Sequence, residues 1–325
     1  MIVEKYKTPH IDRSGHCMTT VGEFLVIYGG FDFWSGKMLS ELLSYNTVSG
    51  ILRRYQLPVE TANAYFASSI CSVGSLVYIF GGSYSPFTVQ STNSLISYDI
   101  YNSTCQTLSP HIDNNDQTTP PPMYGSCIFY HNGSVYVIGG IQSDGYTDSI
   151  HKFCLKTSSW SLVPQNGQKP YLEHRIFGTV FNNRYIKIFD ISTDTWTTRE
   201  TNPENKQYPN DRILESFSFS KNFGYLSGGK IPDTNKNYSD TLKTGLTLHC
   251  TSVVEDSYLY SFGGHGNISN YPNFLERFTV QPPTLYRLCL ESIRRSPNLK
   301  SCISLLPPAI VDDLNLHNID SNFNF

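Results

Sequence analysis

One short motif, an alternating apolar strand that ends in Gly-Gly, recurs five times in the chain and constrains its fold more than any other feature. The five copies are FLVIYGG, SLVYIFGG, SVYVIGG, GYLSGG and YLYSFGG, which end at Gly30, Gly82, Gly140, Gly229 and Gly264. Glycine permits backbone conformations and close approaches that a side chain would block. A unit of strand plus glycine that recurs at intervals of tens of residues predicts a repeat architecture such as a propeller.

The sequence around the Gly-Gly strands predicts four strands per unit. A strand such as RSGHCMTTV precedes the pair, and stretches such as SLISYDIYNSTCQTL follow it with a turn between two further strands. Aromatic residues make up 14% of the chain and charged residues 16%, a balance typical of short half-buried strands joined by tight turns. With 39% hydrophobic residues the chain can fill a core of this all-β kind.

Two of the spacings between Gly-Gly pairs are irregular. Successive pairs lie 52, 58, 89 and 35 residues apart. The 89-residue interval contains a unit around Trp196 without a Gly-Gly strand, and the 35-residue interval lacks a Trp-bearing strand. We therefore expect the fourth and fifth units to be truncated, with sheet edges left unpaired. The last unit offers only three strands, so IVEKY at the N-terminus is predicted to supply the fourth and close the ring.

These features together resemble kelch repeats: Gly-Gly closes one strand, an aromatic residue and then Trp160 or Trp196 follow, and RSGH precedes the first pair. The resemblance to the kelch domain-containing proteins extends over nearly the whole chain. It implies an all-β, kelch-type β-propeller of about six blades, with blades four and five truncated and a short C-terminal helical box. We expect the propeller to occupy residues 1–281, the box residues 282–316 and a disordered tail residues 317–325.

Behind two prolines near the C-terminus, the apolar period changes from two to about 3.6 residues, which predicts a helix. Thr284 suits the N-cap, and Ser296 ends the helix because a residue before proline is pushed out of helical space. The apolar face contains Leu285, Leu288, Cys289 and Ile293, while the charged residues mostly take other faces. Packing of this face against the propeller is the alternative to a role in binding.

The helix resembles an elongin-C-binding box, in which a Leu enters a pocket and a small Cys lets the partner approach closely. The matching residues are Thr284, Leu285, Cys289 and Ile293. After the linker SPNLKSCIS, the stretch LLPPAIVDDL resembles a cullin-2 box rather than a cullin-5 box, and its matching residues are Leu306, Pro307, Ile310 and Leu314. The resemblance implies that the chain is the exchangeable substrate receptor of a cullin-2 ubiquitin ligase, which binds elongin-C (with elongin-B) and cullin-2 through this tail.

The same resemblance implies that the propeller captures the C-terminal end of a target protein. A free carboxylate needs charge-assisted donors, of which a bidentate Arg is best suited. The candidates by repeat position are Arg13, His16, Tyr65, Tyr124, His174, Arg175, Arg212 and His249. We interpret Tyr65 and Tyr124 as the residues that take the place of Arg in blades two and three. The alternative is that the Arg and His residues bridge neighbouring blades through backbone carbonyls.

Composition and cysteine content exclude several other classes of function for this chain. A formal net charge of -3 without a long Lys/Arg run argues against nucleic acid or an anionic membrane as a partner. The sequence shows neither a long apolar run nor a signal peptide, which predicts a cytoplasmic protein with the nucleus as a further compartment. Eight cysteines without CxxC pairs indicate reduced thiols and no zinc site.

No catalytic pattern emerges from the sequence. It contains no nucleotide-binding glycine loop, no Gly-x-Ser-x-Gly elbow and no His/Cys cluster with metal spacing, so we expect no catalysis, no cofactor and no metal. The resemblance leaves a second non-catalytic interpretation open: a scaffold that binds and inhibits a serine/threonine phosphatase in stress-kinase signalling, without a ligase role. Deletion of residues 284–316 discriminates the two, because a scaffold keeps its partner without the tail.

Overall fold

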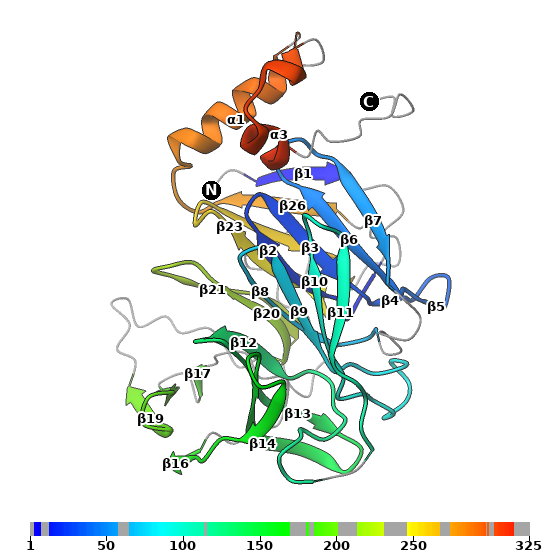
Figure 1. Cartoon of the computed structure of the whole chain (residues 1–325), viewed down its shortest axis with the longest axis vertical. Helices are drawn as coiled ribbons and strands as arrows, with labels where there is room; N and C mark the ends of the chain where they lie inside the picture. Colours follow the sequence, from blue (N-terminus) through cyan, green and yellow to red (C-terminus); the bar gives the residue numbers. More distant parts are fainter. Residues whose placement is uncertain are drawn as a thin grey trace.

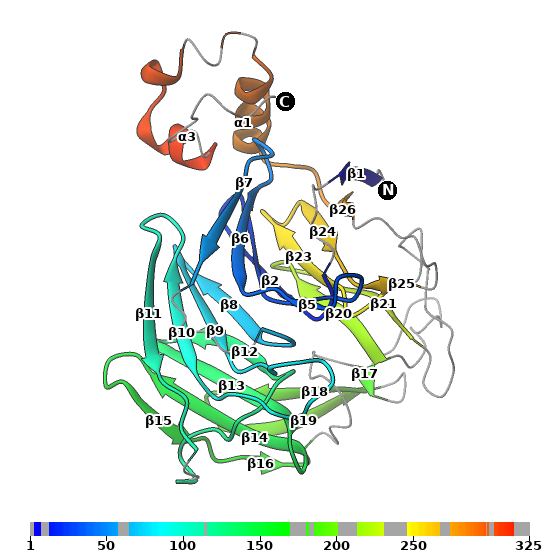
Figure 2. The same ribbon diagram turned by 90° about the vertical axis from the view of Figure 1, so that its right-hand side faces the viewer.

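Antiparallel β-sheets arranged around a common centre make up most of the molecule, and a short helical tail lies outside the ring (Figure 1, Figure 2). The structure, a computed structural model, describes residues 3–7, 13–57, 65–113, 116–169, 180–181, 185–200, 213–230, 246–266, 274–296, 298 and 302–314. Among these residues, five sheets have four strands each and three smaller sheets have two strands each. The all-β propeller expected from the repeats is confirmed.

The first three blades each contain four antiparallel strands that pair in chain order. Blade one contains β2 (Cys17–Val21), β3 (Phe24–Tyr28), β6 (Glu41–Asn46) and β7 (Leu52–Gln56). Blade two contains β8 (Ser69–Val73), β9 (Leu76–Phe80), β10 (Leu95–Asp99) and β11 (Thr104–Ser109). Blade three contains β12 (Cys127–His131), β13 (Ser134–Gln142), β14 (Gly145–Cys154) and β15 (Ser159–Leu162). The loop that follows β3 forms a small hairpin from β4 (Phe31–Asp32) and β5 (Lys37–Met38).

The fourth sheet has four strands, but two of them contain only two residues. Its strand order is β16 (Asn166–Gly167), β19 (Thr195–Glu200), β18 (Tyr185–Asp190) and β17 (Val180–Phe181). The unit has no Gly-Gly strand, and β17 pairs directly with β18. The strand β16, from the preceding connection, pairs in parallel with β19. A neighbouring segment thus restores the strand number that the truncated unit lacks.

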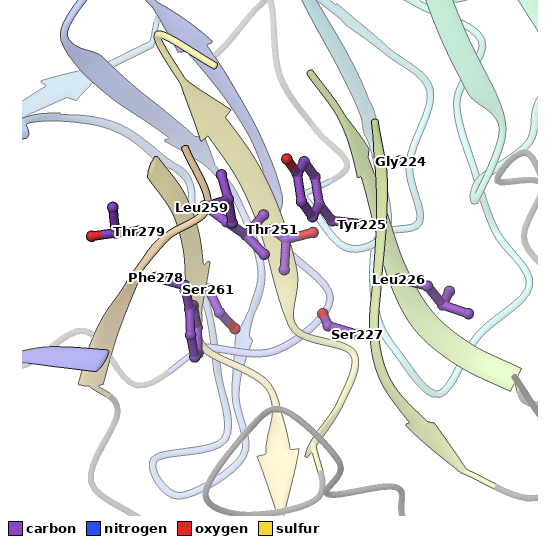
Figure 3. Close-up of a pocket in the computed structure, with 10 residues that line it drawn as sticks. Gly224, Tyr225, Leu226, Ser227, Thr251, Leu259, Ser261, Phe278 and Thr279 are labelled. Carbon is purple, nitrogen blue, oxygen red and sulfur yellow. The ribbon is translucent and has the colours of Figure 1, made fainter. Parts of the chain in front are cut away.

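The fifth sheet consists, among the described residues, of β20 (Ile213–Phe219) and β21 (Gly224–Lys230) alone. Five blades thus have four strands each, and the sheet in the fifth position has two strands among the described residues, in agreement with the truncation expected there. The reason is the short spacing, which leaves residues 230–245 where the first unit has residues 31–64. A cavity opens beside β21, toward the last blade (Figure 3).

The two ends of the chain meet in the last blade, as predicted. This sheet contains β23 (Cys250–Val254), β24 (Tyr258–Phe262), β26 (Phe274–Thr279) and, as its outer strand, β1 (Val3–Lys7). The strand β1 pairs antiparallel with β26, with Val3 opposite Phe278. A further two-stranded sheet joins β22 (Leu246–Thr247) to β25 (His265–Gly266). The N-terminal strand therefore closes the ring by completing the blade that ends it.

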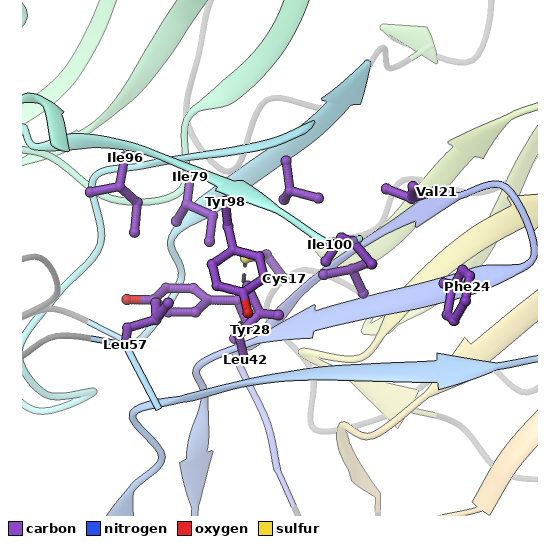
Figure 4. Close-up of a cluster of buried hydrophobic side chains, with 12 residues drawn as sticks. Cys17, Val21, Phe24, Tyr28, Leu42, Leu57, Ile79, Ile96, Tyr98 and Ile100 are labelled. Atoms are coloured by element: carbon purple, nitrogen blue, oxygen red, sulfur yellow. Dashed lines mark hydrogen bonds between the residues drawn. The ribbon is translucent and has the colours of Figure 1, made fainter. Parts of the chain in front are cut away.

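Apolar side chains fill the interfaces between neighbouring blades. Between the first and second blades, Tyr28 and Leu42 pack with Ile79 and Tyr98, all of them buried (Figure 4). The Cys17 thiol lies in the same cluster, 3.7 Å from the Tyr28 carbonyl that it faces. This cysteine thus behaves as a small apolar residue, and all eight cysteines are free thiols.

The two repeat tryptophans join successive units. Trp160 of β15 donates its indole N–H to the Ser109 hydroxyl of β11 at 2.9 Å, and its ring centroid lies 5.8 Å from that of Phe80. Trp196 of β19 donates its indole N–H to the Gln165 side-chain oxygen at 2.8 Å and packs in a cluster with residues of the third blade. Each tryptophan therefore contacts the chain that precedes its own blade.

A series of backbone hydrogen bonds crosses from unit to unit at one repeated position. The amide of each residue donates to the carbonyl of the next, at 2.6 to 3.3 Å, in the order Gly125, Ala67, Gly15, Leu248 and Leu214. All five have a positive φ, between 55° and 67°. Glycine suits this left-handed conformation, whereas Leu and Ala adopt it at a cost of roughly 1–2 kcal/mol. The glycine of the RSGH motif, Gly15, thus connects neighbouring blades through its backbone hydrogen bonds.

The tail consists of α1 (Leu285–Arg295), a short 3-10 turn η1 (Ile303–Leu305) and α3 (Pro308–Asp313). The predicted start and end of α1 are confirmed: the Thr284 hydroxyl accepts from the Arg287 amide at 3.1 Å, and Ser296 is the C-cap. Within the described ranges, no helix is long and apolar enough to cross a membrane. Residues 317–325, expected to be disordered, lie outside the described residues.

Candidate partner-binding surfaces

Helix α1 is fixed to the propeller by one buried arginine. The Arg287 side chain is fully buried and donates to the Glu23 carboxylate, to the Thr47 hydroxyl at 2.8 Å and to the Thr47 carbonyl at 3.0 Å. Its guanidinium carbon lies 5.0 Å from the ring centroid of Tyr258. These partners come from two turns of the first blade and from the start of β24 in the last blade. Helical periodicity places Arg287 away from the apolar face of α1. It does not indicate that the side of the helix with Arg287 is the side that contacts the propeller.

Burial sets the protonation of the ion pair. It raises the pKa of Glu23 to about 7, the nearby Glu255 adds to this rise, and the Arg287 charge opposes it. Burial also lowers the pKa of Arg287, but the Glu23 charge, together with Tyr260 and Glu291, more than offsets that effect and raises the pKa above its ordinary value. Arg287 therefore remains charged at all physiological pH values, and Glu23 is the group of the pair that titrates near neutrality.

Further contacts hold both tail helices to the turn between β6 and β7. The Asn46 side-chain amide donates to the Asp313 carbonyl at 2.5 Å, and Arg294 Nε donates to the Ser49 carbonyl at 3.1 Å. The Tyr286 hydroxyl donates to the Asp313 carboxylate. Both tail helices thus contact this turn, and they also contact each other. The tail therefore has a defined orientation on the first blade.

A small apolar core lies between the two tail helices. Leu290 of α1 and Leu314, which follows α3, are fully buried there, with Val48 of the β6–β7 turn beside them. The partly buried residues at its edge include Ile293, Leu306 and Ile310. Of the four residues predicted to contact a cullin, Pro307 is exposed, Leu306 and Ile310 are half-buried, and Leu314 lies inside this core.

The opposite side of α1 presents an apolar face to solvent. Leu285 is 77% exposed and Leu288 47% exposed, and Cys289 beside them is exposed as well. These three residues, which we call the α1 face, lie three and four positions apart and thus on one side of the helix. Of the residues predicted to bind elongin-C, the structure brings Leu285 and Cys289 together on this face. Thr284 caps the helix, and Ile293 turns toward the tail core.

Arg13 is engaged within its own blade. Its buried side chain donates to the Gly29 carbonyl at 2.9 Å and forms an ion pair with Glu41 at 2.7 Å. Arg54 binds the other oxygen of Glu41 at 3.0 Å. Burial lowers the pKa of Arg13 to about 10, which still leaves it charged at neutral pH. The Arg13 carbonyl accepts from the Gly264 amide of the last blade at 2.9 Å, so this residue contributes to the joining of blades.

His16 and His249 occupy the same place in successive units, and each packs on a Gly-Gly pair of the preceding unit. A Cβ added to Gly263 would lie 2.5 Å from the His16 ring, and one added to Gly228 would lie 2.4 Å from the His249 ring. His249 Nε2 also lies 2.8 Å from the Ser227 hydroxyl. The first glycine of the pair therefore makes room for a buried imidazole from the next unit.

The expected correspondence between Tyr65 and Tyr124 is wrong by one residue. The Gly30 amide donates to the Tyr65 carbonyl at 2.7 Å, and the equivalent Gly82 amide donates to the Met123 carbonyl at 3.0 Å. Met123 is thus the counterpart of Tyr65, and Tyr124 stands one position later. Sequence alone could not decide this register, because a tyrosine occurs within one residue of the repeat position in both units.

The other predicted site residues, His174, Arg175 and Arg212, lie outside the described residues. Within the described ranges, no group of three or more His, Cys, Asp or Glu side chains is placed to hold a metal ion. The arginines and histidines that the structure does describe near the repeat junctions, Arg13, His16 and His249, are buried.

An aromatic patch that sequence reasoning missed covers the loops after the first two Gly-Gly pairs. Trp34 is 83% exposed and Phe87 is 75% exposed. Phe31 contacts Phe33 and Phe87 edge-on, with ring centroids 4.9 and 5.6 Å apart. We call these four residues the loop-face patch. The signal that could have found it is the run FDFW directly after Gly30, followed by a phenylalanine in the next Gly-Gly loop.

Comparison of the repeats with known families identifies the propeller. A model of the KLHDC2/KLHL20/DRC7 Kelch-repeats domain matches residues 15–229. The chain belongs to the kelch-repeat family. A kelch-repeat propeller is a protein-binding scaffold, in agreement with the exposed apolar surfaces described above. The match to the kelch model ends at Gly229, so it leaves out the last blade and the tail.

Curated kelch proteins resemble the chain over most of its length. Kelch domain-containing protein 10 of Homo sapiens is 24% identical over 334 residues, which cover 88% of this chain and 74% of that protein. Kelch domain-containing protein 1 of Homo sapiens is 25% identical over 372 residues, 93% of this chain and 89% of that protein. Kelch domain-containing protein 2 of Bos taurus is 24% identical over 352 residues, 87% of this chain and 84% of that protein.

Proposed function

We propose that this kelch-repeat protein is the substrate-recognition subunit of a cullin-2 and elongin ubiquitin ligase. The observation that carries the proposal is the two-sided placement of α1. Its Arg287 side is docked on the propeller, while the α1 face of Leu285, Leu288 and Cys289 stays exposed. An exposed apolar stripe on a helix held in a fixed orientation is suited to enter a groove on a partner.

Leu285 is the main anchor for elongin-C in this proposal. Full burial of one Leu contributes about 1.5–3 kcal/mol, and truncation of an anchor in a desolvated pocket can cost more than 2 kcal/mol. Cys289, one turn later, is small enough to let the partner helix approach closely. Thr284 and Ile293 support the face from the helix cap and from the tail core.

The second box would meet cullin-2 through its exposed residue. Pro307 is the exposed member of this box, whereas Leu306, Ile310 and Leu314 contribute to the tail core. In the proposal these three hold α3 in place beside the elongin-binding face. The proposal is therefore that the two boxes act as one folded unit.

The target would bind at the other end of the blades. β3 begins at Phe24, next to Glu23, which contacts the tail through Arg287, and it ends at Tyr28, shortly before Phe31, the first residue of the loop-face patch. Tail and loop-face patch thus lie at opposite ends of this strand. We propose that the loop face holds the C-terminal end of a target, with Arg175 and Arg212 as the candidates for its carboxylate because Arg13 is already paired with Glu41. Ubiquitin transfer by other subunits then depends on proximity.

Co-purification with elongin-C, elongin-B and cullin-2 tests the proposal. We expect the Leu285→Ala, Cys289→Phe double variant to abolish capture of the elongins and to keep the thermal transition of the propeller, because both side chains are exposed. Phe87→Ala is the matched control, since it removes an equally exposed apolar side chain from the loop face. Equal capture of elongin-C by the double variant and the unmodified chain would rule out the α1 face as the contact.

The loop-face patch is equally suited to a second candidate function, a scaffold that binds and inhibits a serine/threonine phosphatase without a ligase. An aromatic patch of this kind suits protein binding whether or not a ligase is attached. The two candidates predict opposite patterns. For a scaffold, Phe87→Ala weakens phosphatase capture, the Leu285→Ala, Cys289→Phe variant keeps it, and no elongin co-purifies.

A further inference from the structure

A second cavity lies among the loops of the second and third blades. Its lining comes from the loop between β9 and β10, the connection from β11 to β12 and the turn between β13 and β14, and its volume is about 420 Å³. Val89 lines it, is 55% exposed and follows shortly after Phe87 of the loop-face patch in the same loop. The cavity and the loop-face patch therefore adjoin each other on one face of the propeller.

Hydrogen bonds hold the walls of this cavity in place. The Asn93 side chain is buried; its nitrogen donates to the Ile112 and Pro120 carbonyls, and its oxygen accepts from the Ile112 amide, all at 2.9 Å. In the loop between β9 and β10, the buried Ser83 hydroxyl lies 2.7, 3.1 and 3.0 Å from three carbonyl oxygens within residues 85–90. The cavity is therefore preformed, as most ligand sites in proteins are.

The lining of the cavity carries negative charge. Asp113 and Asp144 are the charged residues among the described ones that line it. Asp113 Oδ1 lies 2.9 Å from His111 Nε2, and the Asp113 side chain is 92% exposed. Within the described ranges, no lysine or arginine forms an ion pair with either carboxylate. Both carboxylates therefore have oxygens available to a cationic ligand.

The remaining lining favours a basic side chain as that ligand. Val89, Ile112 and Pro120 add aliphatic surface beside the two carboxylates. Lysine and arginine pack an aliphatic stem on such surface while the charged head reaches a carboxylate. A metal ion is a poorer match, because it needs more ligands than two carboxylates supply. Among the described residues, no group of three or more His, Cys, Asp or Glu side chains is placed to hold one.

We propose that this cavity, which we call the acidic pocket, binds a lysine or arginine side chain of the target whose C-terminal end lies on the loop face. The inference rests on the proposed function and narrows the class of targets to those with a basic residue at a fixed distance before the C-terminus. A segment that crosses the loop-face patch reaches the acidic pocket next, because Phe87 and Val89 belong to one loop. The acidic pocket shares no residue with the α1 face.

Selection from a peptide library tests the proposal. Short random peptides with a free C-terminus are captured on the immobilised full chain, and the retained peptides are sequenced by mass spectrometry. We expect lysine and arginine to be enriched at one position by about threefold or more, as one or two exposed ion pairs allow. The Asp113→Asn, Asp144→Asn double variant should lose this preference, because asparagine keeps the shape of the side chain and removes its charge.

The control variant is Asp99→Asn, Asp190→Asn, which removes the same net charge elsewhere. Asp99 and Asp190 are the last residues of β10 and β18, and their Oδ1 atoms accept from backbone amides of the turns that follow. Asparagine keeps that acceptor, so the turns should persist. This variant should retain the preference for a basic residue.

A retained peptide, labelled and titrated by fluorescence anisotropy, separates a direct contact from general charge attraction. Citrulline in place of its arginine, or acetyl-lysine in place of its lysine, keeps the stem and removes the charge. The neutral peptide should bind the unmodified chain about threefold to tenfold more weakly. It should bind the Asp113→Asn, Asp144→Asn variant as well as the charged peptide does, because the two changes remove one interaction.

Several results would overturn the proposal. They are the absence of a basic preference, the same preference in the Asp113→Asn, Asp144→Asn variant, and loss of the preference in the control variant. Failure to retain any peptide would also overturn it, while capture of elongin-C would still test the ligase proposal. A preference that depends on the two carboxylates but is equal for peptides with an amidated C-terminus would support the acidic pocket and overturn capture of a C-terminus.

Discussion

The blades and the tail of this molecule are held in place in opposite ways. Blade interfaces repeat similar apolar clusters and backbone hydrogen bonds from unit to unit, so that each contact is one of many. The tail is held by a few different contacts, and the most buried of them is made by one guanidinium, Arg287, which meets a carboxylate more than two hundred residues earlier in the chain. A repeated contact leaves a periodic pattern in the sequence, whereas a single long-range ion pair leaves none. Loss of one interaction should therefore matter far more for the tail.

Arg287→Ala should have the largest effect. Removal of one partner from a buried ion pair leaves the other charge unpaired and costs roughly 3–5 kcal/mol. We expect the substitution to release α1 from the first and last blades while the propeller stays folded. Hydrogen exchange should then show fast exchange throughout α1 and unchanged protection in β3 and β6.

Arg295→Ala is the control for Arg287→Ala. Arg295 lies on the same helix and approaches Glu291 to 3.5 Å, but its side chain is exposed, so its removal should cost about 0–1 kcal/mol. Equal exchange of α1 in both variants would show that the tail is not held by the buried pair. The comparison of the two regions would then lose its basis.

Much of the propeller could be predicted from the sequence. The Gly-Gly motif marks the second strand of a blade, and irregular spacing between the motifs indicates where strands are missing. The role of the N-terminal strand in the last blade followed from a count of strands. The recruitment of β16 could not be predicted, since a two-residue strand has no pattern of its own. In the tail, helical periodicity indicated that Leu285 and Cys289 share a face. It could not indicate which face meets the propeller, because that depends on Glu23 and Thr47, which are remote in sequence.

Glu23 should make stability depend on pH. Its pKa rises from 4.5 to about 7 on folding, so between these values the folded chain holds a proton that the unfolded chain releases. The free energy of unfolding should therefore fall as pH rises from about 4.5 to about 7, by at most about 3 kcal/mol. Denaturant titrations across this range measure the slope. Glu23→Gln should flatten it, and an unchanged slope in that variant would assign the pH dependence to other groups.

The smallest expected effect lies at a blade interface, where one contact is shared among many. Trp160→Phe keeps most of the ring contact with Phe80 and removes the hydrogen bond to Ser109, which should cost about 1 kcal/mol in urea unfolding of the propeller. Ser109→Ala removes the same bond from the other side and should cost a similar amount. If both substitutions remove the same hydrogen bond, their effects should not add. The stability of the double variant should then lie within a few tenths of a kcal/mol of that of the less stable single variant. Fully additive losses would mean that each side chain acts through separate contacts, and the two blades would then be joined less by this bond than by the apolar cluster around it.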